Sequence, residues 1–305
     1  MARAGGKAIL LGEHAVVYGI PALVVGLNRG VEAVARRPRN GMRSLRIGDM
    51  SPVSPDDDSI LGKAFGALLE ACSLDAPVVL EATSALPIGA GVGSSAALGV
   101  ACARALAETF ALPTSPELEQ QRALAWERIF HGNPSGIDTA AAALGGCLFY
   151  TRGAPPEPLR LRRGFSVVLA FSGQSSDTKK MVDGIAKLRE QKRALFEKQL
   201  DSIRSLVMNA RLALEAGDLV GLGKLMDLNQ MILSAWMLST QEIEELCAIA
   251  RDAGALGAKL TGAGGGGCVV ALCDGSPKVI LEAWERAGYQ GFASPVGASL
   301  PDPFP

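Results

Sequence analysis

Two charged residues, Lys7 and Asp138, lie in apolar segments of the sequence, where a charged side chain is expected to have a partner or a function. Asp138 is followed by TAAAALGG, which has almost no other polar side chain, and Lys7 precedes the apolar run AILL. A carboxylate on such a surface is either paired or placed for a reaction. Phosphoryl transfer requires a carboxylate beside the attacking hydroxyl and a cation near the reacting oxygens. Both residues are therefore candidates for this chemistry, with Lys7 as the partner of Asp138.

A glycine-rich segment, LPIGAGVGSSAALGVACARAL at residues 86–106, could hold the phosphate groups. Its glycines allow positive φ and close backbone approach, and Ser94 or Ser95 can cap the helix that follows. Backbone N–H groups at a helix N-terminus bind phosphate, and a serine hydroxyl there can ligate a phosphate-bound Mg²⁺. The segment lacks the Gly-Lys-Ser/Thr of the P-loop and the acidic residue of the dinucleotide fingerprint. A tight strand-to-helix turn is the alternative interpretation.

A second glycine-rich segment, KLTGAGGGGCVVAL at residues 259–272, places four consecutive glycines between apolar strands. Glycines are entropically costly to fold, and a tight hairpin needs two at most. We expect a triphosphate or a substrate to pass close to this backbone; a flexible loop is the alternative. Elsewhere, Glu13 and His14 follow a glycine and predict a turn directed into a cleft. Glu127 lies at the end of the helix before Asp138.

The composition narrows the class of protein. Of the 305 residues, 48% are hydrophobic and 20% are charged, which is the balance of a soluble globular protein. The net charge of −1 argues against a general binder of nucleic acid or of membrane surfaces. The start of the chain does not resemble a signal peptide. Six scattered cysteines without a C-x-x-C pair predict free, mostly buried thiols in a reducing cytoplasm.

The pattern of elements predicts an α+β fold, since both halves mix helices and strands. In the first half we expect strands within residues 7–35 and at 77–83, a loop or short hairpin at 38–58, and helices at 59–72 and 94–110. The second half is expected to begin with long helical stretches and to end in strands around the second glycine segment. A proline- and arginine-rich stretch near 155–166 predicts a boundary between domains 1–165 and 166–305.

The motifs together resemble the GHMP kinases, the family of galactokinase and of homoserine, mevalonate and phosphomevalonate kinases. PIGAGVGSSAA is similar to the ATP-phosphate motif of the family, and KLTGAGGGGC is similar to its third motif. GEHAVVYGIPAL and HGNPSGIDTAAAALGG are most similar to the mevalonate kinases among them. The resemblance implies a two-domain fold with a ferredoxin-like portion in the C-terminal domain. ATP and substrate would bind in the cleft between the domains.

The resemblance also implies roles for individual residues. Asp138 would be the catalytic carboxylate and Lys7 its cationic partner, while Ser95 and Glu127 would hold Mg²⁺. The residues expected to bind the phosphates of ATP are Pro87, Gly89, Ala90, Gly91, Val92, Gly93, Ser94 and Ser95. Those expected near the substrate are Glu13, His14, Thr178, Gly264 and Gly265.

The sequence departs from the family pattern at three positions. Gly6 stands where proline usually precedes the lysine, and Val92 replaces a common leucine. Ser176 stands where some relatives carry an arginine, and Lys179 or Lys180 could substitute for it. The last departure bears on contacts at the substrate end of the site.

The implied activity is ATP-dependent phosphorylation of the primary hydroxyl of mevalonate, which gives 5-phosphomevalonate, with ATP and Mg²⁺ as cofactors. Another alcohol, such as phosphomevalonate or a sugar, is the first alternative. A catalytically silent sensor that binds ATP is the second, although both Asp138 and Ser95 are present. Mevalonate and ATP are the expected partners, without nucleic acid or membrane, in the cytoplasm, and a homodimer is one expected state.

Overall fold

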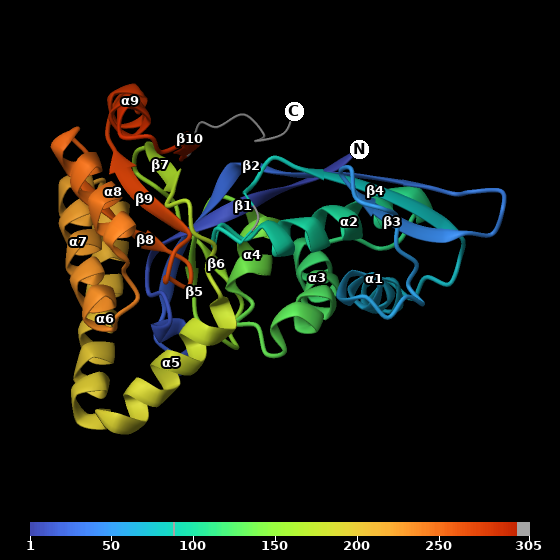
Figure 1. Cartoon of the computed structure of the whole chain (residues 1–305), viewed down its shortest axis with the longest axis horizontal. Helices are drawn as coiled ribbons and strands as arrows, with labels where there is room; N and C mark the ends of the chain where they lie inside the picture. Colours follow the sequence, from blue (N-terminus) through green and yellow to red (C-terminus); the bar gives the residue numbers. More distant parts are fainter. Residues whose placement is uncertain (88, 298–305) are drawn as a thin grey trace.

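The protein is built from two sheets, one in each half of the chain, as the computed structural model shows (Figure 1). The structure describes residues 1–87 and 89–297. Residue 88, within the first glycine segment, lies outside the described residues. The mixture of helices and strands in both halves confirms the α+β class.

The N-terminal half contains a six-stranded sheet with the order β3-β4-β2-β5-β6, and β1 pairs with β2. Its strands are β1 (Ala2–Leu11), β2 (Ala22–Arg36), β3 (Arg43–Ile47), β4 (Val78–Ser84), β5 (Cys147–Tyr150) and β6 (Glu157–Pro158). Its helices are the short 3-10 helix η1 (Ala15–Tyr18), α1 (Ile60–Ala71), α2 (Ser94–Phe110), α3 (Pro116–His131) and α4 (Ile137–Leu144). α2 and α4 pack against β1 and β2, and α3 packs against α1, α2 and α4.

Local sequence explains where several of these helices begin. Ser59 and Ser115 precede α1 and α3, and each side chain accepts a hydrogen bond from a backbone N–H in the first turn. The expected loop or short hairpin at 38–58 is confirmed, because Leu45 and Val53 form an antiparallel bridge there; β3 also pairs in parallel with β4. Leu45 is fully buried at the centre of β3 and Ile47 packs against the same core, although the other residues of this strand are polar.

The C-terminal half contains a four-stranded sheet with the order β10-β7-β9-β8. Its elements are β7 (Phe165–Phe171), α5 (Thr178–Gln191), α6 (Arg193–Ala216), α7 (Leu219–Ala235), α8 (Gln241–Asp252), β8 (Gly257–Thr261), β9 (Cys268–Cys273), α9 (Lys278–Arg286) and β10 (Gly291–Val296). Helices separate β7 from β8, and α9 separates β9 from β10, which is the β-α-β-β-α-β order of ferredoxin-like folds. The predicted domain boundary falls at the start of β7 and stays a prediction.

The two halves touch along the sheets. β10 lies against β2, and Asn28 N donates a hydrogen bond of 2.9 Å to Ser294 Oγ. α5 extends away from the sheets below the junction and meets α6 at its far end (Figure 1). The first turn of α5 therefore lies close to the junction, while the rest of this helix is largely exposed.

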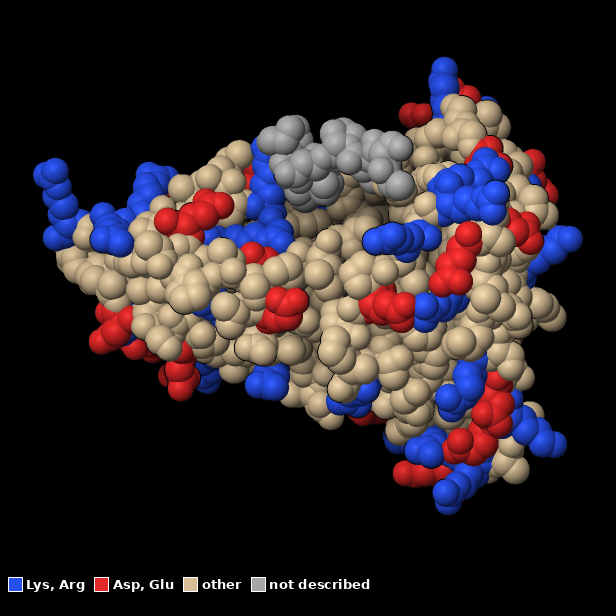
Figure 2. Space-filling view, turned by 180° about the vertical axis from the view of Figure 1, so that it is seen from behind, with Lys and Arg blue, Asp and Glu red and all other residues tan. Residues whose placement is uncertain are grey.

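The surface charges are mixed. On the face shown in Figure 2, Lys and Arg lie among Asp and Glu over both halves rather than in one patch. The six cysteines are all buried free thiols, as the sequence predicts. Within residues 1–87 and 89–297, no helix has the length and apolar character needed to cross a bilayer.

Candidate active site

Lys7 and Asp138 meet where the two halves of the protein enclose a cavity. Lys7 Nζ lies 3.1 Å from Asp138 Oδ1 and donates a hydrogen bond of 2.9 Å to Gly91 O. The lysine side chain is 3% exposed, whereas the aspartate side chain is 37% exposed. The cation is thus fixed inside the protein while the carboxylate remains within reach of an incoming hydroxyl.

β1 and the first glycine segment position Lys7 together. The residue lies in the middle of β1 rather than at a strand start, and its backbone N–H donates to Val92 O at 2.9 Å. Gly93 has φ 72°, and a Cβ there would lie only 2.9 Å from Lys7 Cγ. Gly6 is similarly confined, since a Cβ there would lie 2.8 Å from Val92 O. The glycine that departs from the family pattern therefore lets β1 pack against the loop.

α4 positions Asp138 in its first turn. The positive end of the helix dipole favours a negative charge at this place. Arg104 supports the other end of α4 by donating to Ala143 O at 2.6 Å. The acid is therefore carried on a short helix that is held at both ends.

The first glycine segment uses its carbonyl oxygens to bind the rest of the protein. In the described part of this loop, Gly89 O accepts from Ser176 N, and the carbonyls of Gly91 and Val92 accept from Lys7. This arrangement leaves N–H groups as the side of the loop that can face a phosphate. One expectation is wrong: Gly93 occupies the cap position of α2, and neither following serine caps it.

The half-buried Ser95 and the buried Glu127 form a pair beside the Lys7–Asp138 centre. Ser95 Oγ donates to Glu127 Oε1, and Trp126 Nε1 lies 3.3 Å from the same hydroxyl. Burial, with a contribution from the charge of Asp138, raises the pKa of Glu127 to about 7, against the hydrogen bond from Ser95. His131 Nε2 lies 3.6 Å from Glu127 Oε2 and also lines the cavity.

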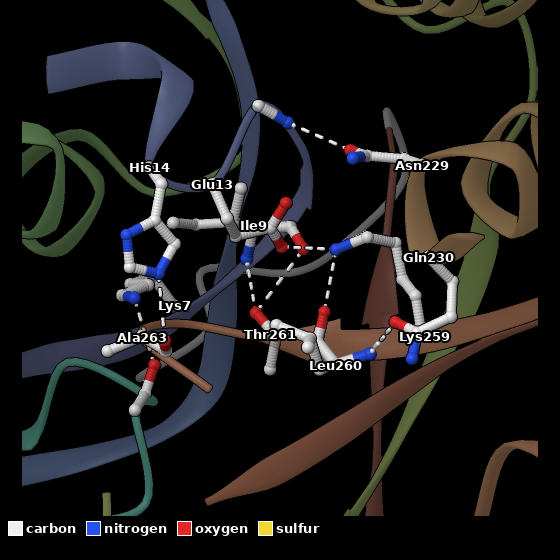
Figure 3. A network of polar contacts seen from close by, with 12 residues as sticks. Lys7, Ile9, Glu13, His14, Asn229, Gln230, Lys259, Leu260, Thr261 and Ala263 are labelled. Carbon is white, nitrogen blue, oxygen red and sulfur yellow. Dashed lines mark hydrogen bonds and ion pairs between the residues drawn. The ribbon is translucent and has the colours of Figure 1, made fainter. Parts of the chain in front are cut away.

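Glu13 and His14 leave the end of β1 in different directions (Figure 3). His14 lines the cavity, and its Nε2 lies 2.8 Å from Ala263 O. Burial lowers the pKa of His14, so the ring is neutral near pH 7 and Nε2 carries the proton donated to the carbonyl. Glu13 instead pairs with Lys259, and both side chains are 0% exposed. Glu13 is not one of the described residues that line the cavity.

The glycines of the second segment are confined by the protein itself. A Cβ at Gly264 would lie 2.6 Å from Leu238 O, and one at Gly265 would lie 2.5 Å from Met181 Sδ. A Cβ at Gly262 would lie 2.8 Å from Gly91 O. These contacts within the protein explain part of the run of glycines, and the expectation that a triphosphate or a substrate passes close to this backbone stays a prediction. From this segment, Gly262 and Ala263 line the cavity. Gly264 and Gly265 are not among its described lining residues.

The cavity has a volume of about 510 Å³ and takes its walls from both halves of the chain. Thr178 and Lys179, in the first turn of α5, line it as expected for the substrate end. Lys180 is not among its described lining residues. Lys179 is therefore the lysine placed to substitute for the arginine that Ser176 replaces.

The sequence analysis did not single out Arg152 or His131 as site residues, although both line this cavity. Arg152 follows β5, and its guanidinium donates to Asn133 Oδ1 at 2.7 Å and to Val17 O at 3.5 Å. Both partners are neutral, so the charge remains available to an anion. The signal was an arginine two residues after the end of an apolar strand.

Comparisons with known proteins show the family of this chain. Family models described as "GHMP kinases N terminal domain" and "GHMP kinases C terminal" match residues 59–146 and 210–290. A mevalonate kinase of Pyrococcus horikoshii is 35% identical, covering 94% of this chain and 92% of that protein. A mevalonate kinase of Aeropyrum pernix is 35% identical, covering 97% and 95%.

Solved structures show the same architecture. The crystal structure of L. major mevalonate kinase in complex with R-mevalonate has a TM-score of 0.88 and 30% identity, covering 99% of this chain and 97% of that chain. The Methanococcus jannaschii mevalonate kinase has a TM-score of 0.84 at 20% identity over 98% of both chains, which shows the fold alone. From its motifs, its paired lysine and aspartate and these matches, the chain belongs to the GHMP kinases.

Proposed function

We propose that this kinase transfers the γ-phosphoryl group of ATP to the primary hydroxyl of mevalonate, which gives 5-phosphomevalonate. The observation that carries this proposal is the position of Lys7 Nζ between Asp138 Oδ1 and Gly91 O. That lysine joins the candidate acid to the candidate phosphate loop. The similarity to mevalonate kinases over nearly the whole chain supports the choice of acceptor.

Asp138 and Lys7 would act on the hydroxyl of the acceptor. Asp138 accepts the hydrogen bond, and then the proton, of the attacking hydroxyl, which makes the oxygen a better nucleophile. The ammonium of Lys7 stabilises negative charge on that oxygen, and it is already desolvated and held at 3.1 Å from the acid. No rearrangement of either group is then needed during the reaction.

The residues beside this centre fit Mg²⁺. Mg²⁺ prefers oxygen ligands and is usually bound by one or two carboxylates together with substrate phosphates. Ser95 Oγ and the carboxylate of Glu127 are in contact, and they lie at the start of α2 where the phosphates would bind. Within the described residues, no cluster of three metal-ligating side chains occurs, which suits a metal completed by phosphate oxygens. When bound, Mg²⁺ would neutralise charge on the phosphate groups.

The rest of the cavity fits a small anionic alcohol. Mevalonate has a carboxylate at one end and a reactive hydroxyl at the other, joined by a short branched carbon chain. Arg152 and Lys179 offer positive charge for the carboxylate, while Val16, Val17 and Ile137 offer apolar surface for the carbon chain. The neutral His14 can accept a hydrogen bond through Nδ1.

Release of ADP with Mg·ATP and a panel of mevalonate, phosphomevalonate, galactose and homoserine tests the proposal. We expect saturable turnover with mevalonate alone. In Asp138→Asn the kcat should fall by about 10²–10⁴-fold, because a general base acts mainly in the transition state, while ATP still binds. Turnover with a different alcohol would overturn the proposed substrate, and bound ATP without turnover on any alcohol would favour a silent sensor.

Arg152→Met in the same assay tests the substrate end. It should raise the KM for mevalonate and leave the KM for ATP little changed, because the guanidinium is placed for the carboxylate. An unchanged KM for mevalonate would remove Arg152 from the site.

A cytoplasmic location and a homodimer stay predictions. The buried reduced thiols support a reducing compartment. Exposed apolar side chains on α6 and α7, such as Leu212 and Met231, support contact with a second copy. Sedimentation of the full chain tests the second prediction, and a monomer at all concentrations would overturn it.

A further inference from the structure

The buried pair of Glu13 and Lys259 joins the two halves of the protein directly behind the cavity. Glu13 follows β1, and Lys259 lies in the middle of β8, so 246 residues separate the two in sequence. Both side chains are 0% exposed, and Lys259 Nζ also donates to Leu260 O at 2.6 Å. Neither residue is among the described residues that line the cavity. The pair therefore has no place in the chemistry proposed above.

The neighbouring contacts hold the same segment of chain from the same side (Figure 3). Thr261 Oγ1 accepts from Ile9 N at 2.8 Å, and Asn229 Oδ1 accepts from Gly12 N at 3.1 Å. His14 Nε2 lies 2.8 Å from Ala263 O. Polar contacts thus tie the end of β1 to β8, α7 and the second glycine segment.

These contacts cost free energy that an apolar junction would not. Burial raises the pKa of Glu13 and lowers that of Lys259, although each charge favours the ionised form of the other. In the described part of the chain, buried side-chain atoms without a hydrogen-bond partner include Glu13 Oε2 and Asn229 Nδ2. A buried ion pair is weak evidence for stability, and its best-attested use is to fix one arrangement over others.

The backbone conformation of His14, beside the cavity, depends on one fixed arrangement of its neighbours. His14 has φ 58°, an uncommon conformation for a residue other than glycine. Such a conformation persists only where the surroundings hold it in place. The carboxylate of the preceding residue and the carbonyl of Ala263 supply that restraint from two sides.

We propose that Glu13 and Lys259 are positioning residues, whose ion pair sets His14 and the Ala263 carbonyl against the acceptor alcohol. Glu13 then acts through Lys259 and His14 without touching the substrate. This inference rests on the proposed function only in that an acceptor alcohol binds in the cavity. It applies to whichever alcohol the wild-type enzyme phosphorylates.

The test uses Glu13→Gln, Lys259→Met and the double variant Glu13→Gln/Lys259→Met in the full chain. Each single variant leaves a buried group without its partner and should lower thermal stability. The double variant leaves no buried charge and should recover most of that loss. Its KM for the acceptor should nevertheless stay raised by about ten- to hundredfold, because misplacement of a binding wall is not cured by stability. The KM for ATP should change little.

The outcome that overturns the proposal is a double variant with both stability and acceptor KM restored, since the pair would then serve the fold alone. Equal changes in both KM values would also overturn it. Ile280→Ala, a core truncation on α9, is the control for lost stability and should leave the acceptor KM unchanged.

A second readout does not depend on activity. The chain has two histidines, so His131→Asn assigns the ring signals of His14 by NMR. The signal of the His14 ring should shift in the double variant and not in Ile280→Ala. An unmoved signal would overturn the inference while leaving the proposed kinase reaction untouched.

Discussion

At the scale of single residues, the site contains three buried ionisable side chains: Glu127, His14 and Lys7. Burial raises the pKa of Glu127 to about 7 and lowers the pKa of His14, so one carboxyl and one imidazole are pushed toward their neutral forms. Lys7 is equally buried, but it has an anion and a carbonyl within hydrogen-bond distance. The buried ammonium of Lys7 therefore already has its polar partners. Ionisation of Glu127, in contrast, becomes favourable only when a cation binds beside it.

The raised pKa of Glu127 makes stability depend on pH. Below pH 4.5 the carboxyl is protonated in the folded and unfolded states, and its favourable contribution is fully present. Between pH 4.5 and about 7 the carboxyl ionises in the unfolded chain before it ionises in the folded protein, so this contribution is lost progressively as the pH rises to about 7. Glu127→Gln, which stays neutral, should therefore be more stable than the wild type at pH 8.5 by roughly 1–3 kcal/mol, and not at pH 4.

Chemical denaturation in the presence of EDTA at the two pH values measures this difference. Glu117→Gln, on the exposed side of the same helix, is the control and should show no gain at high pH. Equal effects of Glu127→Gln at both pH values would contradict the prediction.

At the scale of elements, the two glycine segments are packing surfaces for each other. Gly262 has φ 90°, and a Cβ there would lie 2.8 Å from Gly91 O. A Cβ at Gly267 would lie 2.9 Å from Ala90 O. The β8–β9 turn therefore packs against the first glycine segment, and Lys7 passes along the same segment beside Gly93.

Gly262→Ala should weaken both the fold and the phosphate site. Its positive φ costs about 1–3 kcal/mol of stability for a residue other than glycine. The clash with Gly91 O should in addition displace the loop and raise the KM for ATP. Thermal unfolding and steady-state kinetics measure the two effects.

Gly254→Ala is the matched control for this change. Gly254 has φ 93°, but a Cβ there would meet nothing within 4 Å. It should share the loss of stability and keep the KM for ATP of the wild type. A similar KM for ATP in both variants would show that the contact between the segments does not shape the phosphate site.

At the scale of the whole molecule, the end of β1 belongs to both halves. Ile9 and Gly12 bond to Thr261 and Asn229, and Asn28 bonds to Ser294 at a second place. Neither half satisfies these buried groups without the other. A boundary near residue 165 can therefore separate two sheets in the chain without separating two independent folding units.

We accordingly expect the two halves to unfold together. In scanning calorimetry, the van't Hoff enthalpy should equal the calorimetric enthalpy, as for a single cooperative transition. Two resolved transitions would show instead that each half is stable alone, and that the predicted domains are also thermodynamic units.

Features that depend on neighbouring residues could be predicted from the sequence. α2 begins and ends at the expected residues, because a glycine-rich loop precedes it and an apolar pattern runs through it. The pair of Lys7 and Asp138 was also predicted, because charges in apolar runs are rare enough to imply a partner. The family resemblance followed from motifs of the same local kind.

Features that depend on the register of distant strands were decided only by the tertiary structure. The partner of Glu13 is Lys259, whose position opposite the end of β1 follows from how the two sheets meet. Arg152 reaches the cavity because β5 pairs with β2 and ends beside α4, which no spacing in the sequence states. The sequence alone determined which side chains and turns were available for phosphoryl transfer. Only the tertiary structure decided which of these side chains face the cavity. The contacts that place them join residues more than two hundred positions apart in the sequence, and such contacts form only when the two halves pack together.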